Sequence, residues 1–288
     1  MIALPKQGKL TQGTIFCGGY AEGYEKLPVW GFVITARCDT AHNKVPVVNY
    51  LPMVRFEDWL RHQGGLAVVE RVYIESKGKL KNILLQSGLS PSLLDVHEPT
   101  LVAKTNFPEP SSADFSKKAE KQRKDAALAL ALADCIELTR NIIDGNGADR
   151  ESIEKILTES DVPLKAIVTE LLTHKLSGYY YVPTIGELTE MGSTSGYVVL
   201  LREVRHLPRE QASKLSEGMP RPDPPAGGGS AVCFDVFDFA YPVAETLSPW
   251  VEHIMQIFCN LFGRVGVADI DRGVVARIIN CALLKGAA

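Results

Sequence analysis

The feature that most constrains the fold of this chain is an apolar run, Val29–Thr35, that changes abruptly into the polar sequence Arg37–His42. An apolar run of this length and composition predicts a buried β-strand. Because Cys38, Asp39 and His42 follow the strand directly, we expect a thiol, a carboxylate and an imidazole at one rim of a sheet. No other segment combines so much expected burial with so many reactive groups.

These three residues have three competing interpretations. A zinc site would use Cys17, Cys38 and His42, with His62 or Asp39 completing a tetrahedral set. No CxxC pair preorganises such a site, so we expect no metal and no cofactor. A catalytic site would use Cys38 as the nucleophile, with its pKa lowered by Arg37 and His42. In a structural turn, Cys38 packs as a small hydrophobic residue, Asp39 accepts hydrogen bonds from the following amides, and His42 is exposed. The structural turn is the role that we expect.

Composition indicates a cytoplasmic protein. The chain has 288 residues, 45% of them hydrophobic, with a formal net charge of −3, so no general polyanion-binding surface is implied. Its six cysteines are scattered, which is typical of reduced thiols. No apolar run is long enough to cross a membrane, and the N-terminus does not resemble a signal peptide.

Residues 1–105 are expected to form a β-rich, barrel-like region. Pro46 and Pro52 place one of its strands at a sheet edge or a bend. Lys77-Gly78-Lys79 predicts a hairpin turn between two others. The expected strands are Thr14–Phe16, Val29–Thr35, Val45–Val54, Val68–Ser76 and Leu80–Gln86.

The pattern changes to a helical period after the breaker-rich sequence at residues 106–112. Residues 113–178 are expected to form an inserted helical bundle. Its longest helix is Lys117–Asp144, which ends at a Gly-Asn-Gly sequence, and two shorter helices begin at Asp149 and Asp161.

Residues 179–288 are expected to return to strands and to close with two helices. The proline- and glycine-rich segment Met219–Ser230 is either a domain linker or a long surface loop. The expected elements are extended structure at Tyr179–Pro183, strands within Gly196–His206 and Ala231–Phe239, helical turns at Pro208–Glu217, and helices Ser248–Gly263 and Asp271–Leu284. The fold class is therefore α+β, with an N-terminal antiparallel barrel-like β region, an inserted helical bundle, and a C-terminal strand and two helices. If the late strands complete the N-terminal sheet, these regions form one composite domain.

The longest helix begins with a cluster of basic residues. Positive charge at a helix N-terminus opposes the macrodipole, so a phosphate backbone or an acidic partner would be a suitable neighbour. The alternative is a solvated helix end. The cluster consists of Lys117, Lys118, Lys121, Arg123 and Lys124.

The helix Ser248–Gly263 is expected to carry a polar stripe beside its apolar face. An ordinary solvent-facing stripe is richer in Lys and Glu, so this one suits a buried polar network or a surface that meets a partner. The stripe consists of His253, Gln256, Asn260 and Arg264.

Two resemblances add to this picture. The N-terminal part resembles the PemK/MazF toxin family at Gly13-Thr14-Ile15, Ile34-Thr35 and Val45–Val54, which implies a small SH3-like barrel. The catalytic arginine pattern of that family is missing, so its ribonuclease activity is not implied. The sequences I-T-x-x-C-D (Ile34–Asp39) and S-P-W-x-E-H-x-x-Q-x-F (Ser248–Phe258) are similar to bacterial proteins of anti-phage or toxin-type gene clusters. That similarity implies the kind of gene cluster to which the protein belongs, and it implies no particular reaction.

The sequence therefore favours a non-catalytic binding or accessory subunit of a bacterial defence or stress-response complex. A protein partner would dock on the polar stripe, with the basic cluster assisting, and nucleic acid is the alternative partner for that cluster. The rival interpretation is a nuclease or hydrolase with its site around Cys38, Asp39 and His42. Phosphate-binding glycine loops and known nuclease motifs are absent from the sequence.

Overall fold

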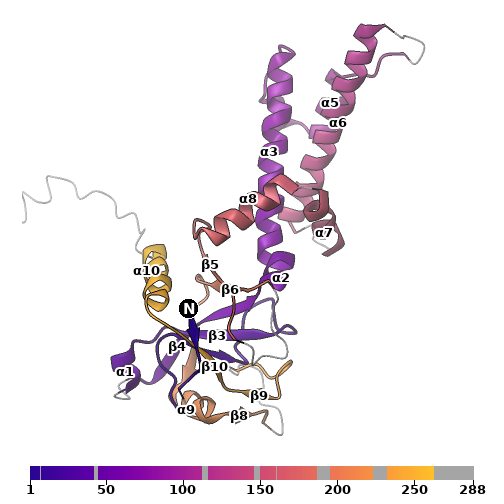
Figure 1. Ribbon diagram of the computed structural model, residues 1–288. Helices are drawn as coiled ribbons and strands as arrows, with labels where there is room; N and C mark the ends of the chain where they lie inside the picture. The colour runs from indigo at the N-terminus through magenta and orange to yellow at the C-terminus, as the bar shows by residue number, and fades with distance from the viewer. Residues whose placement is uncertain are drawn as a thin grey trace, which may run out of the picture.

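The computed structural model describes residues 1–6, 8–41, 45–111, 116–145, 150–159, 161–186, 195–222 and 232–262. Eight of the described strands form one curled antiparallel sheet, a half-barrel, from which a long helical arm projects (Figure 1). The predicted α+β class is confirmed. None of the described helices combines the length and the hydropathy that a membrane-spanning segment requires.

The sheet is assembled from both ends of the chain, as the composite alternative predicts. Its strand order is β1-β10-β2-β3-β4-β6-β5, and β7 also pairs with β4. The small strands β8 and β9 pair separately. The bounds are β1 Ile2–Ala3, β2 Thr14–Cys17, β3 Val29–Val33, β4 Val47–Arg55, β5 Tyr179–Val182, β6 Tyr197–Leu200, β7 Arg205–Pro208, β8 Met219–Pro220, β9 Phe239–Ala240 and β10 Pro242–Thr246.

Both faces of the sheet are buried, because alternate residues of a strand point to opposite faces. Trp30 and Phe32 of β3 lie in a core that also holds Val251 and Ile254 of helix α10 (Trp250–Phe262). Val33 of β3 lies in a second core on the other side, which helix α9 (Arg209–Glu217) covers. The two cores explain why every residue of β2 and β3 is buried.

β4 is an interior strand, so the predicted edge or bend position is wrong. It pairs with β3 on one side, and on the other side with β7 over Val47–Tyr50 and with β6 over Met53–Arg55. Pro52 falls between these two segments, at a position where proline interrupts no strand pairing on that side. An interior strand therefore tolerates this proline.

The strands and hairpin predicted at residues 68–86 are also wrong. This segment is part of one helix, α3, which runs from Gly65 to Gln86. Its β-branched residues suggested strands, but tertiary packing overrides that propensity. Several buried residues are four apart, which is a helical spacing: Val68, Val72, Ser76, Leu80 and Leu84. From Phe56 to Asn106 every described element is a helix, so the β-rich region does not extend to residue 105.

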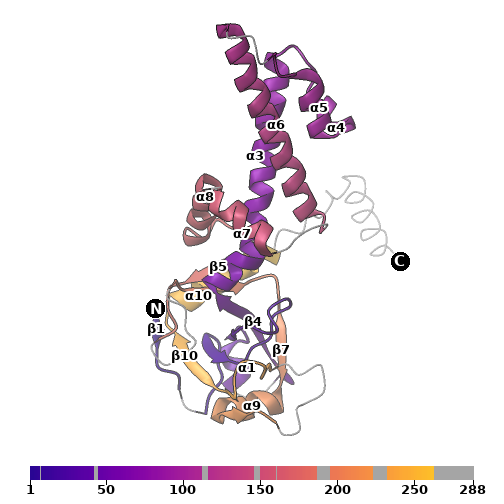
Figure 2. The ribbon, with the colours of Figure 1, turned by 90° about the vertical axis from the view of Figure 1, so that its right-hand side faces the viewer.

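The helical arm consists of α3 and the antiparallel helix α6 (Lys117–Ile143), with α5 beside α6 (Figure 2). Small residues such as Ala129 and Ala133 let α6 pack closely on Leu80 and Leu84 of α3. The predicted helix Lys117–Asp144 is therefore confirmed. The remaining helices are α1 Arg37–Ala41, α2 Phe56–Trp59, the π-helical turn η1 Leu60–Gly64, α4 Leu93–Val96, α5 Pro99–Asn106, α7 Arg150–Glu159 and α8 Asp161–Leu172.

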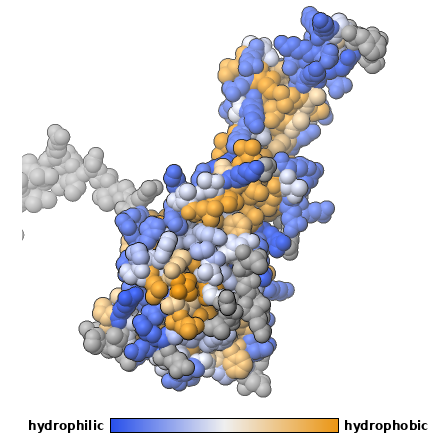
Figure 3. Space-filling view, in the orientation of Figure 1, coloured by the Kyte–Doolittle hydropathy of each residue, from blue (hydrophilic) through white to orange (hydrophobic). Residues whose placement is uncertain are grey.

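The base of the arm is held to α8 by a bidentate ion pair. Arg71 of α3 donates two hydrogen bonds, of 2.8 and 3.0 Å, to the carboxylate of Glu170. Apolar side chains remain visible along the arm in Figure 3. The large exposed apolar residues of the arm helices include Ile74, Leu85, Leu101 and Leu128.

The C-terminal part differs from the prediction in one element. Residues 232–238, expected within a strand, form bends and turns, and the main strand follows at β10. The predicted helix at Ser248–Gly263 is confirmed as α10. The predicted helix Asp271–Leu284 and most of the segment Met219–Ser230 lie outside the described residues.

Gly78 tests whether residues 68–86 are a helix or a hairpin. A Cβ atom at Gly78 would meet open space, so Gly78→Ala should raise the free energy of unfolding by about 0.5–1 kcal/mol, the helix-propensity difference. Chemical denaturation measures this change. As the matched control, Gly31→Ala should destabilise, because its Cβ would lie 2.2 Å from the Phe16 ring. A loss of stability in Gly78→Ala would contradict the helix.

Candidate functional site

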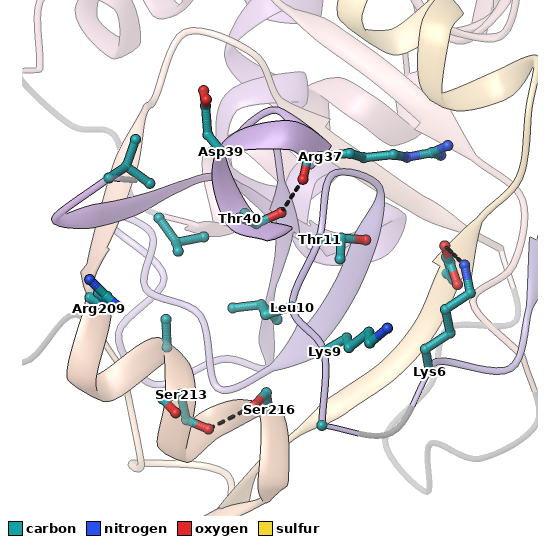
Figure 4. Close-up of a pocket in the computed structure, with 15 residues that line it drawn as sticks. Lys6, Lys9, Leu10, Thr11, Arg37, Asp39, Thr40, Arg209, Ser213 and Ser216 are labelled. Carbon is teal, nitrogen blue, oxygen red and sulfur yellow. Dashed lines mark hydrogen bonds and ion pairs between the residues drawn. The ribbon is translucent and has the colours of Figure 1, made fainter. Parts of the chain in front are cut away.

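A cavity of about 670 Å³ lies on the side of the half-barrel that carries α1 and α9 (Figure 4). Its walls come from four places that are far apart in the chain: the loop before β2, α1, the start of β4, and α9, with one residue of β10. We call it the α1–α9 pocket. Its lining residues are Lys6, Gly8, Lys9, Leu10, Thr11, Arg37, Asp39, Thr40, Val45, Val48, Arg209, Ala212, Ser213, Ser216 and Glu245.

The pocket exists because β4 and β7 hold α9 beside the loop before β2. Pro208 of β7 pairs with Val47 of β4, and the amide of Arg209 donates to the carbonyl of Pro46 at 3.0 Å. Leu10 and Val48 pack together in the core that α9 covers, and both are almost fully buried. These contacts give the pocket an apolar floor.

The rim of the pocket is cationic. Lys6 is neutralised by Glu245, whose carboxylate lies 3.1 Å from its ammonium group. Lys9, Arg37 and Arg209 form no ion pair within the part of the chain that the structure describes. Figure 4 places Arg209 on the opposite side of the cavity from Lys9 and Arg37.

The structure separates the Cys38, Asp39 and His42 candidates. The segment after β3 forms the short helix α1 rather than a simple turn. Asp39 lines the pocket, whereas Cys38 is exposed and does not. The structural interpretation predicts that Cys38 packs as a small hydrophobic residue. Because Cys38 is exposed, that prediction is wrong. His42 lies outside the described residues.

The turn chemistry expected of Asp39 is not found among the described residues. Within the described residues its carboxylate accepts no backbone hydrogen bond; its one contact is with the Cys38 thiol, Sγ to Oδ1 at 3.6 Å. The segment is instead anchored by Thr35, whose hydroxyl accepts a hydrogen bond of 2.6 Å from the amide of Asn49.

Cys17 is excluded as a partner of this site by its burial. Its thiol is directed to the carbonyls of Phe239 and Tyr241, at 3.4 and 3.6 Å. Burial raises the pKa of Cys17 to about 11, so the thiol stays protonated at neutral pH. Over the described ranges, no three His, Cys, Asp or Glu residues come together as a metal site.

The polar stripe of α10 is divided between the interior and the surface. His253 is half-buried, and its Nδ1 atom forms a hydrogen bond of 2.9 Å with the hydroxyl of Tyr180 on β5. Gln256 and Asn260 are exposed, as a docking surface requires. Arg264 lies outside the described residues.

His253 belongs to a ring cluster that the sequence does not reveal. His174, at the end of α8, stacks on Tyr180 with ring centroids 4.2 Å apart and meets His253 edge-on at 5.0 Å. Its backbone has a φ of 57°, a left-handed conformation that is uncommon outside glycine. Burial, assisted by His253, lowers the pKa of His174, and burial raises the pKa of Tyr180 to about 12.

The basic cluster lies at the tip of the arm. Ser116 caps α6 by accepting a hydrogen bond from the amide of Ala119, and this cap offsets part of the unfavourable charge. Lys124 pairs with Glu120 at 2.8 Å, and Arg123 donates to the carbonyl of Ser111. The other members, Lys117, Lys118 and Lys121, are exposed.

The tip of the arm is remote from α10 (Figure 1, Figure 2). The 27 residues of α6 alone extend over about 40 Å. One small partner therefore does not reach both the polar stripe and the basic cluster, although each remains a predicted binding surface by itself.

Known proteins do not identify this chain. Comparison with models of protein families, with curated proteins and with solved structures found no match. The pocket and its chemistry are therefore the basis for inferring a function.

His174 predicts a pH dependence of stability. Because its pKa is lowered in the folded state, the unfolded chain binds more protons, and the free energy of unfolding should fall as the pH is lowered below about 6.5. His174→Asn removes the imidazole and tolerates the left-handed backbone. Denaturation between pH 5 and pH 8 should show a shallower slope for this variant, and an unchanged slope for His97→Asn at an exposed histidine. If the free energy of unfolding depends on pH equally in the wild type and in His174→Asn, the buried ring cluster is contradicted.

Proposed function

We propose that this protein is a non-catalytic binding subunit that holds an anionic group of its partner in the α1–α9 pocket. The observation that carries the proposal is that Lys9, Arg37 and Arg209 line one cavity, from its two sides, without carboxylate partners among the described residues. Arginine forks and lysine ammonium groups are the usual protein ligands of phosphate and carboxylate. The chain as a whole has a net charge of −3, so this concentration of positive charge is local.

The lining of the pocket supports binding rather than hydrolysis. Its two carboxylates are Asp39 and Glu245, and Glu245 is already paired with Lys6. The described lining residues include no cysteine and no histidine, so they supply no Cys–His or Ser–His pair. The rival hydrolase centred on Cys38, Asp39 and His42 would have to act outside this cavity.

The setting of the function remains part of the proposal. The similarity of Ile34–Asp39 and Ser248–Phe258 to proteins of anti-phage or toxin-type clusters supports a bacterial defence or stress-response complex in the cytoplasm. Either nucleic acid or an acidic protein segment supplies the anionic group that the pocket requires. A protein docking on Gln256 and Asn260 is a second proposal, and the exposed aromatic residues Trp250 and Phe262 on the same helix support it.

Charge reversal in the pocket tests the proposal. We expect the wild-type protein to bind at least one of three probes: inorganic pyrophosphate, a 20-nucleotide oligo(dT) or poly-glutamate. The double variant Arg37→Glu/Arg209→Glu should weaken that binding at least roughly tenfold, because each charge-assisted hydrogen bond contributes about 1.5–3 kcal/mol. Isothermal titration calorimetry measures the affinities.

Two control variants make this test specific. Lys214→Glu reverses an exposed charge on the same helix, α9, but outside the pocket lining. Cys38→Ser changes the exposed thiol beside Asp39. Both should bind within about twofold of wild type, since neither side chain lines the cavity. Equal weakening by Lys214→Glu, or no binding of any probe by the wild type, would reject the proposal.

A further inference from the structure

We infer that the ligand of the α1–α9 pocket is a nucleoside phosphate, with its phosphate at the cationic rim and its nucleoside over the apolar floor. This inference rests on the proposed function, because it names the ligand of the same site. The shared chemistry is a terminal phosphate monoester joined to one nucleoside. A free nucleotide and the phosphorylated end of a single strand both provide it.

The charge of the rim matches a phosphate monoester. Lys9 and Arg37 lie on the same side of the cavity and together supply two positive charges, whereas Arg209 lies across from them (Figure 4). A phosphate ester carries about −1.5 to −2 at neutral pH, so it neutralises the charge of Lys9 and Arg37 almost completely. A single carboxylate of a protein partner would leave part of that charge unmatched.

Hydroxyl groups of the lining add hydrogen-bonding capacity. The hydroxyl of Thr40 donates to the carbonyl of Arg37 at 3.1 Å, and that of Ser216 donates to the carbonyl of Ser213 at 2.7 Å. The hydroxyls of Thr11 and Ser213 have no hydrogen-bond partner within the described ranges. They are therefore available to phosphate or sugar oxygens.

The apolar floor of the pocket favours a nucleoside over an inorganic anion, because an inorganic anion has no apolar surface to place against it. Leu10, Val45, Val48 and Ala212 line it; Val45 is half-buried and the other three are buried. A flat base or a sugar face covers such a surface and removes it from water. Asp39 lies at the rim opposite Ser213 and Ser216 in Figure 4, and its carboxylate is directed away from them, so the hydroxyls of Thr11 and Ser213 are the groups available to the sugar.

The size of the cavity restricts the ligand to one or two nucleotides. A volume of about 670 Å³ lies within the range of about 300–1,000 Å³ that is usual for small-molecule sites. The described lining includes no aromatic side chain, whereas grooves that track single strands stack successive bases on aromatic rings. The pocket is therefore suited to one terminal or free nucleotide and not to the interior of a strand.

Calorimetry with matched probes tests this inference. The probes are inorganic phosphate, pyrophosphate, the four common ribonucleoside 5′-monophosphates, their nucleosides, and oligo(dT) with a 5′-phosphate or a 5′-hydroxyl group. At least one monophosphate, or the 5′-phosphorylated oligonucleotide, should bind tenfold or more tightly than inorganic phosphate and than its own dephosphorylated form. Binding of the monophosphates identifies a free nucleotide as the source, and binding of the 5′-phosphorylated strand alone identifies a strand end.

Asp39→Ala tests the charge of the rim. This variant should bind the nucleotide as tightly as the wild type or more tightly, because the carboxylate that it removes is directed away from the rest of the lining (Figure 4). It should leave pyrophosphate binding equal or stronger, because one negative charge is removed from the rim. Thermal unfolding of the variant checks that the fold is intact.

The outcomes that overturn the inference are distinct from those that overturn the proposed function. If pyrophosphate binds through Arg37 and Arg209 but no nucleotide or phosphorylated strand binds more tightly, the nucleoside inference is wrong and the anion-binding function stands. If oligo(dT) with a 5′-hydroxyl group binds as tightly as the phosphorylated form, the pocket does not recognise a terminal phosphate. If no anion binds, both proposals are wrong.

Discussion

The pairing of β4 with strands on both of its sides is the constraint on which the rest of the structure depends. This nine-residue strand, about 30 Å long, pairs with β3 along one side and with β6 and β7 along the other. At its C-terminal end the chain enters α2 and then the helical arm. At its other end, Val48 lies in the pocket lining and the carbonyl of Pro46 anchors α9. One strand thus places the arm and the pocket at opposite ends of the half-barrel.

Local sequence predicts the elements whose burial pattern is simple. β2 and β3 read as strands because continuous apolar runs suit a sheet that is buried on both faces, and α6 reads as a helix because alanine and leucine dominate it. The strands predicted where α3 lies show how such a prediction fails. Its valines suggested strands, although the spacing from Val68 to Leu84 is helical, and a count of periodicity rather than of β-branched residues would have identified it.

The candidate site is harder to predict for a physical reason. Lys9, Arg37 and Arg209 come from segments that only the pairing of β4 with β7 and β3 brings together. No local pattern marks them, because a cation on a loop or at a helix start is common. The sequence did identify the segment Arg37–Asp39, but it selected Cys38 and Asp39 as the reactive groups, whereas Arg37 and Asp39 line the pocket. The His174–Tyr180–His253 cluster is equally dependent on tertiary structure, since its members come from the turn after α8, from β5 and from α10.

The most direct test of the central claim is a crystal structure of the full chain grown with tungstate, a heavy tetrahedral dianion. The account predicts anomalous density inside the α1–α9 pocket, in contact with Arg37 or with Arg209, and its loss in crystals of Arg37→Glu/Arg209→Glu. Tungstate bound only elsewhere, for example among Lys117, Lys118 and Lys121 at the tip of the arm, would show that the pocket is not the anion site and would contradict the account.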